Sequence, residues 1–145
     1  SAKSTLVVTT GLLDSATRIE LEAIVANRIS QIATGQTALA TAGLSTFGLQ
    51  IRIGALRVRP FALLPVSVKQ RFGLELDPSD DFLNDSAGVA LTRYPPGMVE
   101  ALAMMENRNA LSKASSITDS LWVLSTQENN DRPTVEARMT ALREL

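Results

Sequence analysis

Acidic residues gather in the middle of the chain, and closely spaced carboxylates could bind a cation. Four oxygen-bearing residues occupy positions 1, 3, 5 and 9 of a twelve-residue calcium-loop frame: Asp77, Ser79, Asp81 and Asp85. Such a loop also needs a glycine at position 6 and a bidentate glutamate at position 12. Phe82 and Gly88 stand there instead. Helix capping and a solvated acidic surface therefore explain this spacing better than a calcium site does.

Two residue types that dominate catalytic sites are missing altogether. The 145 residues contain no histidine and no cysteine. Thiolate nucleophiles, Cys/His zinc sites and histidine general bases are therefore excluded. Phosphate-binding glycine motifs are absent as well. We expect no catalytic residue, no metal and no cofactor. The enzymatic alternative is a His-free enzyme whose acidic cluster holds Mg²⁺.

Basic and acidic residues occupy neighbouring stretches. The basic group comprises Arg52, Arg57, Arg59, Lys69 and Arg71. The acidic group, which follows at once, comprises Glu75, Asp77, Asp80, Asp81 and Asp85. Three interpretations of the basic group remain open: a solvated surface, contact with nucleic-acid phosphates, and contact with the acidic group of a neighbouring copy. Oppositely charged surfaces on one chain suit head-to-tail assembly.

These groups must be positioned by a small set of elements. Apolar spacing predicts a helix over 15–34, which Gly35 would end. Further helices are predicted at 98–111 and 133–145, with a short one opening at Asp77-Pro78. Three strands are expected, at 6–10, at 49–59 with a bulge at 54–55, and at 89–92. The only tryptophan, Trp122, is expected in the main core.

The pattern predicts one α+β domain over residues 1–145, rich in helix, with a small sheet of about three strands. Residues 36–48 are small, uncharged and poorly periodic, so we expect a mobile loop there. Neither a signal peptide nor a membrane span is visible, which favours a virion or cytoplasmic location and no membrane partner.

Together these features favour a non-enzymatic structural subunit of a homo-multimer. The most specific hypothesis is a virion component, such as a phage coat or head–tail connecting protein, with copies of itself and other virion proteins as partners. The principal alternative is a nucleic-acid-binding module that uses the basic strand at 49–59.

Overall fold

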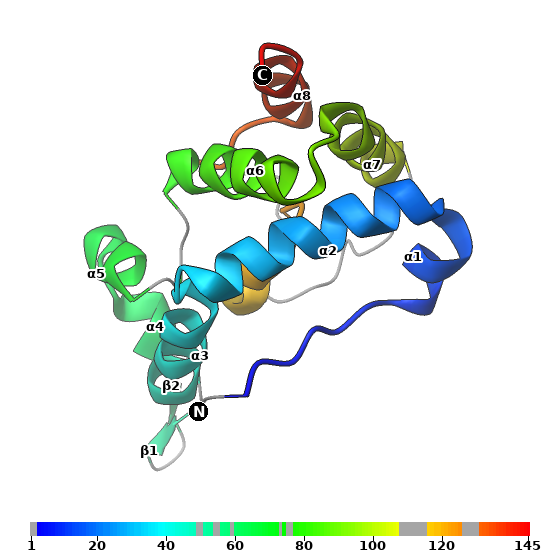
Figure 1. Cartoon of the computed structure of the whole chain (residues 1–145). Coiled ribbons are helices and arrows are strands. Elements are labelled where there is room, and N and C mark those ends of the chain that lie inside the picture. Colours follow the sequence, from blue (N-terminus) through cyan, green and yellow to red (C-terminus); the bar gives the residue numbers. More distant parts are fainter. Residues whose placement is uncertain are drawn as a thin grey trace.

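The protein is mostly helical (Figure 1). The computed structural model describes residues 3–48, 51–53, 56–58, 60–72, 74, 77–107, 116–125 and 131–145. Its elements, in chain order, are α1 (Thr10–Ser15), α2 (Arg18–Ala33), α3 (Gln36–Phe47), β1 (Ile51–Ile53), β2 (Leu56–Val58), α4 (Pro60–Leu63), α5 (Val66–Arg71), α6 (Pro78–Thr92), α7 (Pro95–Asn107), the 3₁₀ helix η1 (Ser116–Leu121) and α8 (Val135–Arg143).

The two longest helices, α2 and α6, begin at well-formed caps. The Thr17 hydroxyl accepts from the backbone N–H of Glu20, whose carboxylate accepts from the backbone N–H of Thr17. Asp77 and Asp80 form the same reciprocal arrangement at the start of α6. Each capping box satisfies two backbone donors that a helix start otherwise leaves without partners. At its other end α2 stops before Gly35, whose φ of 79° confirms the predicted helix stop.

Helix α2 lies at the centre of the packing (Figure 1). Helices α6 and α7 lie against it, and α8 packs on both α7 and α6. The main core consists of Ala23, Val89, Met98, Leu102, Met139 and Leu142. A Cβ added to Gly88 of α6 would lie 2.9 Å from both the backbone N and the Cα of Asn27. Only glycine at position 88 permits this close approach of α6 to α2.

The expectation of a three-stranded α+β sheet is wrong. In the described part of the chain, strands occur only as an antiparallel hairpin, which pairs Ile51 with Val58 and Ile53 with Leu56. The change of phase at 54–55, interpreted as a bulge, instead separates two strands, and residues 54–55 themselves lie outside the described part. Residues 89–92 belong to α6, because this helix continues through Gly88 and does not end there.

Two further expectations differ from the structure. The segment 36–48, expected as a mobile loop, forms helix α3 and its C-cap. Hydroxyls of Thr41, Ser45 and Thr46 donate to carbonyls four residues earlier, so these polar side chains are accommodated within the helix. Trp122 is half-buried beside the core, and its indole N–H donates to Thr118 Oγ1 at 3.3 Å. Among the described helices, none is both long and apolar enough to span a membrane.

Candidate functional site

The interface between α2 and α6 is polar and almost completely buried. On α2, Asn27, Arg28 and Gln31 are at most 6% exposed. On α6, Asp81 and Asp85 are at most 1% exposed. Positions 27 and 31 share one face of α2, and 81 and 85 share one face of α6, because residues four apart lie above one another. The two helices thus bring four polar positions together from opposite sides.

Arginines from the C-terminal part of the chain close this interface. Arg138 of α8 makes a two-pronged contact with Asp85: Nε donates to Oδ2 and Nη2 to Oδ1, both at 2.7 Å. Its Nη1 donates to the Val123 carbonyl at 2.8 Å. Asn27 Nδ2 also donates to Asp85 Oδ1, at 2.6 Å. Asp85 is therefore held by a cation from α8 and an amide from α2.

Arg132, which precedes α8, makes the same kind of two-point contact with Asp81. Its Nε and Nη2 donate to the two carboxylate oxygens at 2.8 and 2.7 Å. Its Nη1 donates to the carbonyl of Asp119 in η1 at 3.1 Å and lies 3.4 Å from that residue's carboxylate. Such paired N–H···O⁻ contacts are the strongest geometry available to an arginine. We call the whole group the buried cluster: Asn27, Arg28, Gln31, Asp81, Asp85, Asp119, Arg132 and Arg138.

Arg28 is the exception within the buried cluster. It forms no ion pair with a described carboxylate, and its Nε and Nη2 both donate to the neutral Asn27 Oδ1. Within the described structure its Nη1 has no hydrogen-bond partner. Ser120 Oγ of η1 is also buried without a partner there. The neighbouring Ser120 carbonyl accepts from Gln31 Nε2 at 3.1 Å.

Burial governs the electrostatics of the buried cluster. It lowers the pKa of Arg28 to about 10, and the positive charge of Arg132 adds to this effect. Burial also raises the pKa of Asp85, against the opposing hydrogen bonds from Arg138. For Arg132, burial is outweighed by the hydrogen bond and charge of Asp81, so its pKa is raised. Burial thus penalises the charge of Arg28 and also that of the paired Asp85, and it is outweighed by the partner only at Arg132.

The chemistry open to the buried cluster is limited by its own pairing. In the part of the chain that the structure covers, no group of three or more carboxylate, histidine or cysteine residues could hold a metal ion. Asp81 and Asp85 point at guanidinium groups, which occupy the position a cation would need. The residues present therefore do not fit a metal centre, and neither carboxylate is free to activate water.

The acidic residues singled out from the sequence fall into two groups. Asp77 is exposed and Asp80 is half-buried; both serve the cap of α6, and Asp80 also accepts from Gln36 Nε2 at 3.2 Å. Asp81 and Asp85 are buried in contacts within the chain, where a neighbouring copy cannot reach them. Glu75 lies outside the described residues.

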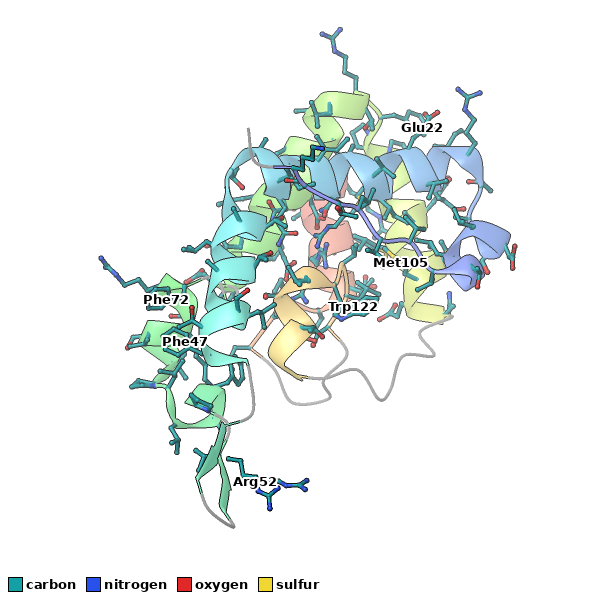
Figure 2. All side chains as sticks on the ribbon, turned by 90° about the horizontal axis from the view of Figure 1, so that it is seen from below. Glu22, Phe47, Arg52, Phe72, Met105 and Trp122 are labelled. Atoms are coloured by element: carbon teal, nitrogen blue, oxygen red, sulfur yellow. The ribbon has the colours of Figure 1, made fainter. Side chains whose placement is uncertain are left out.

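The basic residues lie elsewhere. Arg52 and Arg57 are exposed and directly opposite one another in the hairpin. Figure 2 shows Arg52 on the hairpin, away from the packed helices. Lys69 Nζ lies 4.8 Å from the centre of the Phe61 ring, Arg71 is exposed, and Arg59 lies outside the described residues. A subunit contact through these residues stays a prediction.

Sequence reasoning missed the other half of the site. Asn27, Arg28, Gln31, Asp119, Arg132 and Arg138 were not recognised as functional candidates. One available signal was the run of polar residues at 27, 28, 30 and 31 inside a helix predicted to be amphipathic. These polar residues lie together on one side of the helix, and α6 packs against that side.

Comparison with known proteins points to proteases. The chain is 27% identical over 169 aligned positions to a protein named Protease HtpX homolog from Dictyoglomus turgidum, covering 97% of this chain and 56% of the relative. A protein of the same name from Dictyoglomus thermophilum is 26% identical, with 95% and 55% covered. The chain thus spans about half the length of the curated relatives it matches. No family model matches. No solved structure matches either.

These similarities correct the functional expectations drawn from the sequence. The hypothesis of a virion, capsid or phage subunit is wrong, because both similar proteins are named as protease homologues. The expectation that the protein is not an enzyme is contradicted by the same finding, because both similar proteins are named as protease homologues. The nucleic-acid and magnesium-enzyme alternatives gain no support from these names.

Proposed function

We propose that this chain is part of a peptidase-related protein that acts on polypeptides, and that its buried cluster is an arginine–carboxylate replacement for a metal centre. The similarity to two protease homologues along nearly the whole chain supports the first half. The second half rests on one observation: the cationic groups that face Asp81 and Asp85 are guanidinium groups of the chain itself.

The spacing along α2 supports a comparison with metal-dependent peptidases. One widespread kind carries His-Glu-x-x-His on a helix, in which the histidines bind zinc and the glutamate serves as general base. Positions 27, 28 and 31 have this spacing and are buried against the acidic face of α6, but they hold Asn, Arg and Gln. Asparagine and glutamine keep the polarity of the positions, while Arg28 places a positive charge where that motif has a negative one.

This replacement has a chemical consequence. A hydrolytic water must be activated by a free base or by a metal. Both buried carboxylates of α6 already accept two hydrogen bonds from one arginine each. Hydrolysis carried out by the protein therefore uses groups outside the buried cluster and does not depend on zinc held there.

The test measures metal content and action on polypeptides in the same preparation. The purified protein is analysed for bound zinc and incubated with an unfolded polypeptide, with and without a chelator. We expect less than stoichiometric zinc, and cleavage or stable binding of the polypeptide that the chelator leaves unchanged. Stoichiometric zinc with chelator-sensitive cleavage would overturn the replacement. A protein that neither binds nor cleaves unfolded polypeptide would overturn the peptidase-related role.

Matched variants locate the activity. Asp81→Asn alters the buried cluster, whereas Asp77→Asn alters the exposed cap of the same helix, four positions before Asp81. If the buried cluster is structural, Asp81→Asn lowers thermal stability, and the activity that remains per folded molecule equals that of Asp77→Asn. A specific loss of turnover in folded Asp81→Asn would instead assign this carboxylate a catalytic role.

A further inference from the structure

Arg28 combines deep burial with an unused hydrogen-bond donor. The residue is only 6% exposed, and its Nη1 has no acceptor among the described residues. The other two guanidinium nitrogens share a single neutral acceptor, Asn27 Oδ1. A buried cation normally has a carboxylate partner, since an unpaired one costs several kcal/mol. Among the described residues, no carboxylate is in direct contact with Arg28.

A second unused donor lies on the element that covers this part of α2. Ser120 is 2% exposed, and its hydroxyl has no partner in the described structure. The hydrogen bond from Gln31 to the Ser120 carbonyl holds η1 against α2. Arg28 and Gln31 are three residues apart and thus neighbours on the same helical face. The two unused donors therefore belong to the two elements that meet at the Gln31–Ser120 hydrogen bond, α2 and η1.

We propose that this region binds a small monovalent anion, chloride or a carboxylate as compact as formate, which accepts hydrogen bonds from Arg28 Nη1 and Ser120 Oγ. One anion would accept a hydrogen bond from each of these two donors. It would also supply the counter-charge that Arg28 lacks. This ligand is independent of the proposed peptidase-related role.

The local charges favour an anion over a water molecule. Arg132, Arg138, Asp81 and Asp85 are the charged groups that act on Arg28. With Arg28 itself and with Asp119, whose carboxylate contacts Arg132, the buried cluster holds three positive and three negative charges, but none of the described carboxylates contacts Arg28. Burial and the two other arginines together outweigh the aspartates and lower the pKa of Arg28. A neutral water would satisfy the donors but leave Arg28 without a counter-charge in contact with it, whereas a monovalent anion supplies one.

The first experiment follows thermal unfolding while sodium gluconate is exchanged for sodium chloride or sodium formate at constant ionic strength. A ligand that binds only the folded state raises Tm by an amount that grows with the logarithm of its concentration. At ten times the dissociation constant, we expect a rise of about 4 °C for a chain of this size. Gluconate, which is too large for a buried site, serves as the reference anion. Equal Tm values in all three salts overturn the proposal.

Ser120→Ala is the decisive variant because its wild-type hydroxyl has no partner to lose. We expect it to fold as well as the wild type in gluconate and to lose at least half of the response to chloride or formate. Ser45→Ala is the control, since the Ser45 hydroxyl lies on exposed α3 and donates to the Thr41 carbonyl. Its response should equal that of the wild type. A full response in Ser120→Ala would place the anion elsewhere and overturn the assignment.

Crystals grown in bromide give a direct readout that needs no variant. Anomalous scattering should reveal one bromide within hydrogen-bond distance of Arg28 Nη1 and Ser120 Oγ. A water molecule at that position, or no density between the two donors, would refute the anion site. The relative responses to chloride and formate then distinguish a halide site from a site for the carboxylate of a small metabolite or peptide end.

Discussion

The pair Arg138–Asp85 is the most informative single contact to perturb. Asp85→Asn keeps the size of the side chain but removes its charge. The amide nitrogen of the new asparagine is a donor that faces a donor of Arg138, so one of the two hydrogen bonds is replaced by a repulsive contact. Both side chains are 2% exposed, so water cannot replace what is lost.

The size of the effect follows from what remains around Arg138. After the substitution, Arg138 keeps one neutral amide oxygen at position 85 and the Val123 carbonyl at 2.8 Å, and the nearest carboxylate oxygen is Asp81 Oδ1 at 3.7 Å. Breaking one side of a buried ion pair costs about 3–5 kcal/mol. Typical domains have a total stability of about 5–15 kcal/mol, so the variant should remain folded but lose much of its margin.

Urea denaturation of the variant and the wild type measures this loss. The double variant Asp85→Leu/Arg138→Met should recover most of it, because two apolar side chains need no counter-charge. Glu22→Gln is the matched control: the Arg18–Glu22 pair has a similar N···O distance, 2.8 Å against 2.7 Å, but its side chains are 90% and 57% exposed. We expect no measurable change there. A cost below about 1 kcal/mol for Asp85→Asn, or no recovery in the double variant, would refute this reasoning.

Three more outcomes follow from the structure. Gly88→Ala should destabilise the protein by about 1–3 kcal/mol, because its methyl group would meet the Asn27 backbone at 2.9 Å; Gly11→Ala, with no atom within 4 Å of the added carbon, is the control in the same denaturation assay. Leu102→Ala should cost about 2–5 kcal/mol, since Leu102 is fully buried in the core; calorimetry that shows an unchanged Tm would disprove its core role. Hydrogen bonds lower the pKa of Asp77, so its cap should contribute stability above the ordinary carboxyl pKa and lose it as the pH falls through the lowered value; Asp77→Ala should flatten that part of the stability–pH curve.

Local signals in the sequence predicted the helices better than the sheet. The stop at Gly35 and the start at Asp77-Pro78 were both correct, because capping depends on neighbouring residues alone. The strand expected at 89–92 failed because Gly88 was taken as a helix end. Its actual role, close contact with Asn27, depends on a helix far away in the sequence.

The buried cluster was invisible for a related reason. Apolar spacing located the helix but not its buried side: Ile29 of α2 is 48% exposed, whereas Asn27 is fully buried. Assigning polar residues to the surface is sound only where no buried partner exists. Here Asp85 and Arg138 are partners across 53 positions of sequence, and no local pattern reports such a pairing. The acidic group was identified from the sequence, but its basic partners were expected on a neighbouring copy.

The order in which the pairing residues occur has a consequence for biosynthesis. Asp81 and Asp85 leave the ribosome 51 and 53 residues before Arg132 and Arg138, their respective partners. Until those arginines emerge, docking α6 on α2 would bury two carboxylates without counter-charge, which is strongly unfavourable. The nascent chain should therefore hold α2 and α6 apart and assemble them only once Arg132 and α8 are available. Helices α2, α6 and α8 are thus expected to assemble during translation in one step rather than one after another in the order of their synthesis.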